Sequence, residues 1–154
     1  MILSWDEYFM GLAHLSRLRS KDPSTQVGAV IVNPKKRIVG IGYNGLPAGC
    51  DDKEFPWGRE GNFTESKYAY VVHAELNAIL NSTVKLDDCS IYVSLFPCNE
   101  CAKAIIQSGI KEIVYEDDKY AHTDAVKVSK RMLDAAGVSY RKLDFRTDVS
   151  VSIQ

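Results

Sequence analysis

The sequence has 154 residues, of which 45% are hydrophobic and 25% are charged, so it predicts one globular domain over residues 1–154 and excludes collagen-like and wholly disordered chains. Its 19 Lys and Arg against 20 Asp and Glu give a formal net charge of −1, which disfavours the many phosphate contacts of long nucleic acid. No apolar run approaches the ~18 residues that span a bilayer and the N-terminus lacks a signal peptide's positive charge, so we expect a cytoplasmic protein without a membrane partner.

The first part of the chain predicts a helix followed by a β-hairpin. Ser4 and Glu7 have the spacing of a capping box, and apolar residues recur at helical period over residues 5–18. Two β-branched runs, 27–32 and 38–43, are then separated by turn residues. Because both runs are almost continuously apolar, we expect their sheet to be covered by helices on both faces.

Residues 44–66 lose this periodicity and are rich in glycine, proline and acidic side chains. Loops of this length are uncommon in compact domains unless they are functional or disordered. A binding role and a simple surface excursion are both open for this segment.

The second part of the chain alternates between helical and strand patterns. We expect helices over 71–80, 101–107 and 125–136, and strands over 91–95, 113–115 and 138–143. Gly137 has the position of a helix C-terminal glycine, and residues 144–154 are a weakly patterned tail. Alternation after a hairpin predicts an α/β fold, a three-layer α/β/α sandwich with a mixed five-stranded sheet.

Three residues have the spacing of zinc ligands. Cys98 and Cys101 form a Cys-x-x-Cys pair that can bring two thiolates to one ion, and His73 supplies a third ligand. Three protein ligands leave a fourth position open, which is typical of catalytic zinc. The four cysteines of a cytoplasmic chain favour metal or redox chemistry over disulfides, and a redox or purely structural pair is the alternative.

Glu75 lies two residues after His73 and is a candidate proton shuttle beside the metal. On one continuous helix this spacing would turn the two side chains roughly 200° apart. Both can therefore serve one site only if that site lies off the helix end. The alternative is a first-turn glutamate that stabilises the helix dipole.

The pattern His-x-Glu at 73–75 followed by Pro-Cys-x-x-Cys at 97–101 resembles the signature of zinc-dependent nucleoside deaminases. Segments 22–30, 42–45 and 95–103 are similar to those of the deoxycytidylate (dCMP) deaminases. The resemblance implies one Zn²⁺ per chain, held by His73, Cys98 and Cys101. It also implies hydrolytic deamination of dCMP to dUMP and ammonia, feeding thymidylate synthesis, with Glu75 as the catalytic proton donor and acceptor.

Candidate substrate contacts follow from this reaction. The backbone N–H of Ala74 is unpaired at a helix start and could bind the pyrimidine carbonyl, and Phe96 could pack against the base. Polar residues near the first strand and after a later strand are candidates for the 5′-phosphate: Ser24, Thr25, Lys119 and Tyr120. For each of these four alone, a solvated surface role is the alternative.

The resemblance further implies control by nucleotide effectors, with activation by dCTP and inhibition by dTTP, and a homo-oligomer that is commonly a hexamer. Effector contacts would then lie at Gly42, Tyr43, Asn44 and Gly45, where glycines permit close approach of a phosphate or sugar. The alternative for this segment is a tight turn that ends the second strand.

Other functions remain open. A tRNA adenosine deaminase would share the metal signature and the fold, but it needs a broad basic surface that the net charge does not promise. A free-cytidine deaminase would act without a 5′-phosphate. A non-catalytic zinc-stapled module would usually have four protein ligands.

Overall fold

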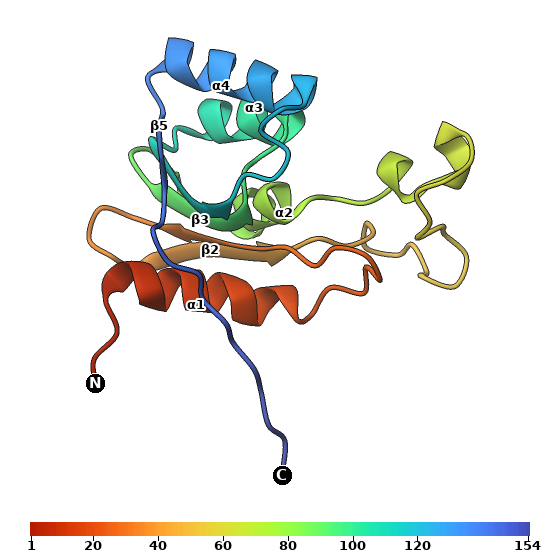
Figure 1. The fold of residues 1–154 in the computed structure, drawn as a ribbon, viewed down its shortest axis with the longest axis horizontal. Coiled ribbons are helices and arrows are strands. Elements are labelled where there is room, and N and C mark those ends of the chain that lie inside the picture. The colour runs from red at the N-terminus through yellow and green to blue at the C-terminus, as the bar shows by residue number, and fades with distance from the viewer.

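A mixed five-stranded sheet with the order β2-β1-β3-β4-β5 forms the centre of the computed structural model, which describes all residues 1–154 (Figure 1). β1 pairs antiparallel with both β2 and β3, whereas β4 and β5 continue parallel to β3. The predicted α/β fold with a mixed sheet is therefore confirmed. The strands are β1 (Gly28–Val32), β2 (Ile38–Tyr43), β3 (Ser90–Leu95), β4 (Glu112–Asp117) and β5 (Ser139–Lys142).

Helix α1 (Trp5–Arg17) alone covers one face of this sheet (Figure 1). Its predicted capping box is present, since Ser4 Oγ accepts from Glu7 N at 3.1 Å and Glu7 Oε1 accepts from Ser4 N at 2.7 Å. Phe9 of α1 packs against the ring of Tyr92 at a centroid distance of 5.3 Å. This contact belongs to a core of eight buried residues between helix and sheet.

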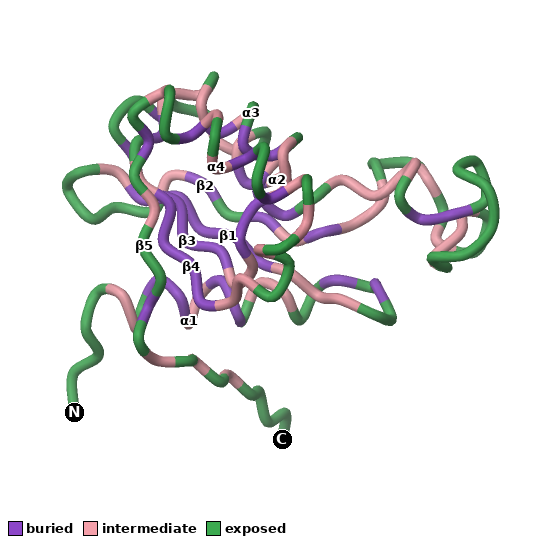
Figure 2. The backbone as a smooth tube through the Cα atoms, turned by 45° about the horizontal axis from the view of Figure 1, so that its top comes forward, coloured by how far each residue is buried: buried purple, intermediate pink, exposed green.

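Three helices cover the opposite face: α2 (Ala74–Asn81), α3 (Asn99–Ser108) and α4 (Asp124–Ala136) (Figure 1). They enclose the larger core of 17 buried residues. Every residue of β1 is buried, as expected for a strand between two helical layers (Figure 2). The same expectation is wrong for β2, because it is an edge strand in which Ile38 and Ile41 are exposed.

The predicted starts of two helices are also wrong. α2 begins at Ala74 rather than at residue 71, because Val72 forms an antiparallel bridge with Gly45 and holds the chain extended. α3 begins at Asn99, with Cys98 as its extended N-cap. Within the segment 44–66 the structure forms one 3₁₀ turn, Phe63–Glu65, and a second, Lys67–Ala69, follows. None of the helices is long and apolar enough to cross a membrane.

Gly28 permits the close contact between α1 and β1. A Cβ atom at this position would lie 1.9 Å from the carbonyl oxygen of Ala13, so the backbone of one element would have to move. We expect Gly28→Ala to lower the free energy of unfolding by about 1 to 3 kcal/mol, as overpacking typically does. Chemical denaturation measures this loss. Gly58→Ala is the matched control, because a Cβ there meets nothing within 4 Å, and an equal loss in both variants would contradict the assignment.

Candidate active site

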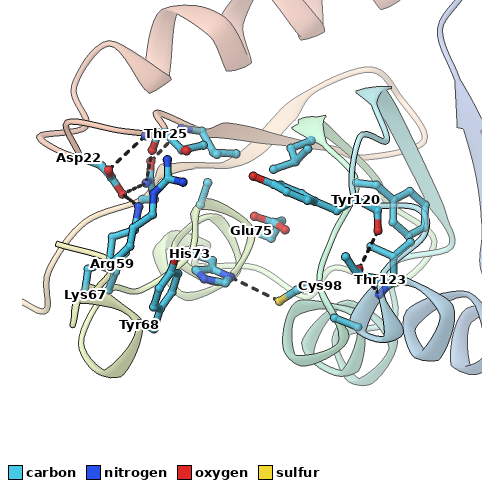
Figure 3. A pocket seen from close by; sticks show the side chains of 18 residues that line it. Asp22, Thr25, Arg59, Lys67, Tyr68, His73, Glu75, Cys98, Tyr120 and Thr123 are labelled. Carbon is cyan, nitrogen blue, oxygen red and sulfur yellow. Dashed lines mark hydrogen bonds and ion pairs between the residues drawn. The ribbon is translucent and has the colours of Figure 1, made fainter. Parts of the chain in front are cut away.

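The three predicted metal ligands converge between the starts of α2 and α3. His73 is the N-cap of α2, Cys98 is the N-cap of α3, and Cys101 lies in the first turn of α3. His73 Nδ1 lies 3.4 Å from the Sγ atom of each cysteine. The three donor atoms all lie within 4.8 Å of one another, and Figure 3 shows the imidazole directed toward Cys98.

These separations fit a tetrahedral zinc ion. Zinc binds histidine nitrogen at about 2.0 Å and cysteine sulfur at about 2.3 Å, so tetrahedral nitrogen and sulfur ligands lie about 3.5 Å apart. The observed 3.4 Å agrees with that value. Two thiol sulfurs and one imidazole are also the donor set that zinc prefers, so the cluster can hold one Zn²⁺ with three protein ligands.

The environment of the cluster favours deprotonated sulfur at Cys98. A hydrogen bond from Cys101 lowers the pKa of Cys98 to about 4, against the opposing effect of burial, and a hydrogen bond with His73 lowers it further. The same hydrogen bond to Cys98, together with burial, raises the pKa of Cys101 above its usual range. A thiolate is the form that binds metal.

Glu75 lies in the first turn of α2 and is buried, with 5% of its surface exposed. His73 has the extended backbone conformation of an N-cap, so the two side chains are not on one continuous helix and both reach the space off its end. Glu75 lines the cavity, and in Figure 3 its carboxylate lies between His73 and Tyr120. Burial raises the pKa of Glu75, although the nearby His73 acts to lower it, and a raised pKa suits a group that exchanges protons near neutral pH.

A cavity of about 470 Å³ opens in front of this cluster and is lined by 18 residues. Its size is in the range of small-molecule sites, roughly 300 to 1,000 Å³. Four of the predicted substrate contacts lie in its wall, whereas Ser24 and Lys119 do not. The four are Ala74, Phe96, Thr25 and Tyr120.

Sequence reasoning missed five polar residues of this wall: Asp22, Arg59, Lys67, Tyr68 and Thr123. Three of them lie in or directly after the long loop, where no periodicity indicates which side chains turn inward. Asp22 begins the segment 22–30, which resembles the dCMP deaminases, but the sequence alone assigns it no role in the site. The combination of an aspartate with Pro-Ser-Thr after it could have indicated a turn-forming aspartate, because Asp side chains often accept from the backbone two residues on.

Asp22 and Lys67 form a buried ion pair beside the cavity. Lys67 Nζ lies 2.7 Å from Asp22 Oδ2 and 3.0 Å from Ser24 Oγ. Asp22 Oδ1 also accepts from the backbone N–H groups of Ser24 at 2.9 Å and Thr25 at 3.1 Å. Burial acts to raise the pKa of Asp22, but the hydrogen bond from Lys67 and those from the backbone outweigh it, so the pKa lies below its usual value.

Replacement of Lys67 by Met would leave the carboxylate of Asp22 buried without a cation. We expect Lys67→Met to cost about 3 to 5 kcal/mol of folding free energy, the usual effect of removing one partner of a buried ion pair. Urea denaturation measures this loss. Lys103→Met is the control, because Lys103 forms only an exposed pair with Glu100 and exposed pairs contribute about 0 to 1 kcal/mol. Equal stability of the two variants would contradict the buried-pair assignment.

A smaller second cavity, of about 180 Å³, adjoins the end of β2 and the segment that follows it. Its wall includes Tyr43, Asn44 and Gly45 from the predicted effector segment. Gly42 is not in this wall, because it packs on α2, where a Cβ atom would lie 2.4 Å from the backbone nitrogen of Ala78. Asn44 lines both cavities.

The chain is similar to a known family of deaminases and to individual members of it. Residues 3–117 match the family model described as the cytidine and deoxycytidylate deaminase zinc-binding region. The chain is 56% identical over 142 residues to a deoxycytidylate deaminase from Pongo abelii and 55% identical over 142 residues to that of Homo sapiens. Each alignment covers 91% of this chain and 80% of the relative.

A solved structure also resembles the chain over nearly its full length. It is a dCMP deaminase from the cyanophage S-TIM5, in complex with dCMP and dUMP. Its TM-score is 0.72 at 28% sequence identity, and the match covers 93% of this chain and 99% of that chain. The sheet and its helical layers are thus those of a dCMP deaminase fold.

Proposed function

Because the chain belongs to the family of zinc-binding cytidine and deoxycytidylate deaminases, we propose that it hydrolyses dCMP to dUMP and ammonia. One observation carries this proposal: the three donor atoms of His73, Cys98 and Cys101 converge beside the buried carboxylate of Glu75, which lines a cavity of about 470 Å³. The identity of more than half of the aligned residues to two curated deoxycytidylate deaminases supports the choice of substrate.

His73, Cys98 and Cys101 would hold the zinc ion. When bound by three protein ligands, zinc lowers the pKa of a coordinated water to about 7 and thereby supplies a nucleophile at neutral pH. Both N-cap ligands lie at helix N-termini, where the partial positive charge stabilises anionic sulfur.

Glu75 would act as the catalytic proton carrier. Its carboxylate takes a proton from the attacking water and delivers it to N3 of the pyrimidine. It then takes the proton of the new C4 hydroxyl and delivers it to the amine at C4, so that ammonia leaves and the C4 carbonyl of dUMP forms. Burial raises its pKa, with His73 opposing, so the group can both accept and donate protons within one catalytic cycle.

Two further residues would position the base. The N–H of Ala74 is at the first position of α2, where no intrahelical acceptor exists, and it can donate to the pyrimidine carbonyl. Phe96 is buried and is held by edge contacts with Tyr115 and Tyr140, at centroid distances of 4.9 and 5.4 Å. Its ring therefore offers a fixed apolar wall for the base.

We also propose the second cavity as the effector site, where dCTP would activate and dTTP would inhibit. Tyr43, Asn44 and Gly45 lie in its wall together with two cationic side chains, Arg19 and Lys21, of which Lys21 pairs with Asp52 of the same wall at 3.3 Å. The Arg19 guanidinium lies 5.8 Å from the centroid of the Tyr43 ring. Such a combination of cations and an aromatic ring suits a nucleotide triphosphate. Because Asn44 lines both cavities, a ligand in one can bias the other.

The assembly, location and extent of the protein remain part of this proposal. We expect a homo-oligomer, commonly a hexamer, from the family resemblance. Ser24 and Lys119 lie outside the cavity wall, and they stay candidates for contacts with the 5′-phosphate of the substrate. All four cysteines are free, which is consistent with the cytoplasmic location we propose. The family model ends at residue 117, and the single deaminase domain that we propose extends from residue 1 to 154.

A substrate panel tests the proposed function against its alternatives. Zinc-loaded protein is incubated with dCMP, with deoxycytidine and with a tRNA anticodon stem-loop that contains adenosine, and ammonia release is measured. We expect turnover of dCMP that dCTP increases and dTTP decreases. Preferred turnover of deoxycytidine would indicate a free-nucleoside deaminase, and turnover of the stem-loop alone would indicate a tRNA adenosine deaminase. Release of ammonia from none of them would favour the non-catalytic zinc module.

A further inference from the structure

The larger cavity contains two cationic side chains outside the metal cluster, Arg59 and Lys67. They lie on the same side of the cavity as Asp22 and Thr25, and Tyr120 and Thr123 lie on the opposite side (Figure 3). A negatively charged group that enters this side of the cavity therefore meets positive charge. The two cations differ in whether a carboxylate of the chain already neutralises them.

The charge of Lys67 is already neutralised. Its ammonium lies 2.7 Å from Asp22 and 3.0 Å from the Ser24 hydroxyl, and both members of the ion pair are buried. To bind a phosphate directly, Lys67 would have to give up the carboxylate of Asp22 and leave it unpaired, which is costly in a buried site. Through its ion pair with Asp22, Lys67 is thus suited to fix the end of the loop 44–66 against the cavity wall.

The charge of Arg59 is not neutralised by the chain. None of its ion pairs includes Arg59, although the side chain lines the cavity and is accessible from solvent. A guanidinium presents several N–H donors in a planar fork that matches the oxygens of a phosphate, and it stays charged at any physiological pH.

The backbone connects Arg59 to the buried ion pair. Lys67 N donates to the carbonyl oxygen of Gly58 at 2.8 Å, so the residue directly before Arg59 is attached to the residue that Asp22 holds. The start of the Arg59 side chain is thereby fixed relative to the cavity wall, even though the surrounding loop has little regular structure.

We propose that Arg59 recognises the 5′-phosphate of the nucleotide and is a specificity-determining residue, with Lys67 and Asp22 as positioning residues. This inference rests on the proposed function, since it concerns the same cavity. The loop 44–66 would then determine the preference for a nucleotide over a nucleoside. Arg59 lines the cavity, whereas the other candidates, Lys119 and Ser24, do not.

Calorimetric titration of the zinc-loaded protein with dUMP and with deoxyuridine tests this assignment without turnover. The two ligands differ only in the phosphate. We expect Arg59→Gln to weaken the binding of dUMP roughly 10- to 100-fold, the equivalent of one charged hydrogen-bonding partner, and to leave the binding of deoxyuridine unchanged. Arg59→Lys should restore part of the preference, because it restores the charge without the planar fork.

Lys53→Gln is the matched control, because Lys53 is an exposed cation of the same loop that lines neither cavity. Inorganic phosphate should compete with dUMP in the native protein and not in Arg59→Gln. The assignment is overturned if the native protein does not prefer dUMP, if Arg59→Gln retains the preference, or if it weakens both ligands equally. A protein that releases no ammonia from dCMP, yet loses its dUMP preference in Arg59→Gln, would overturn the proposed reaction and retain the phosphate site.

Discussion

Glu75→Gln is expected to abolish nearly all deamination while the protein stays folded and keeps its zinc. The amide has almost the shape of the carboxyl group but cannot accept the proton of the attacking water. A positioned proton carrier contributes typically 10²- to 10⁴-fold to a rate, and Glu75 is the acidic residue that lines the cavity beside the metal donors.

Stability should not fall in this variant. Burial disfavours the charged form of Glu75 and raises its pKa, so a neutral amide at the same place avoids that cost. The measurements are the initial rate with dCMP, the zinc content and the thermal unfolding midpoint. Glu100→Gln is the control, since Glu100 is an exposed first-turn residue of α3 that pairs only with Lys103. A near-normal rate in Glu75→Gln would disprove the proton-carrier role.

Cys98→Ser is expected to lose most of its zinc and its activity but to remain folded. Cys98 lies 3.4 Å from His73 Nδ1 in the metal cluster, and a serine hydroxyl is a poor zinc ligand beside a thiolate. The variant should still form α3, because Cys98 is the N-cap of that helix and serine is among the preferred N-cap residues.

Metal analysis and circular dichroism of the same sample separate the two possible roles of the zinc. A folded, zinc-depleted and inactive protein is the outcome expected for a catalytic ion. Unfolding together with zinc loss would indicate that the ion only holds two helices together, and would contradict the catalytic assignment. Cys50→Ser is the control, because Cys50 is a free thiol outside the metal cluster, and its zinc content should not change.

The sequence was most informative where spacing along the chain determines position in space. Cys98 and Cys101 are one helical turn apart at a helix start, so their shared site followed from local geometry, and the imidazole of His73 completed a set of three zinc ligands. The mixed sheet followed in the same way from alternating helix and strand patterns. Whether Glu75 and His73 can face one site depended on whether His73 belongs to the helix. The structure shows that His73 does not, because it is the extended N-cap of α2.

The sequence was least informative where position depends on long-range contacts. The bridge between Gly45 and Val72, which delays the start of α2, joins residues that are far apart in the chain. Lys67 lies directly after a loop rich in charges, and the carboxylate that neutralises its buried ammonium belongs to Asp22, 45 positions away. Arg59 belongs to no helical or strand pattern, and the residue before it, Gly58, accepts a hydrogen bond from the backbone N–H of Lys67.

The central claim is tested most directly by the ultraviolet absorbance and ammonia release of zinc-loaded protein mixed with dCMP. We expect the cytosine absorbance to change to that of uracil, with ammonia and dUMP formed in equal amounts, and we expect removal of zinc by a chelator to stop both. Unchanged dCMP in the presence of a fully zinc-loaded and folded protein would contradict it.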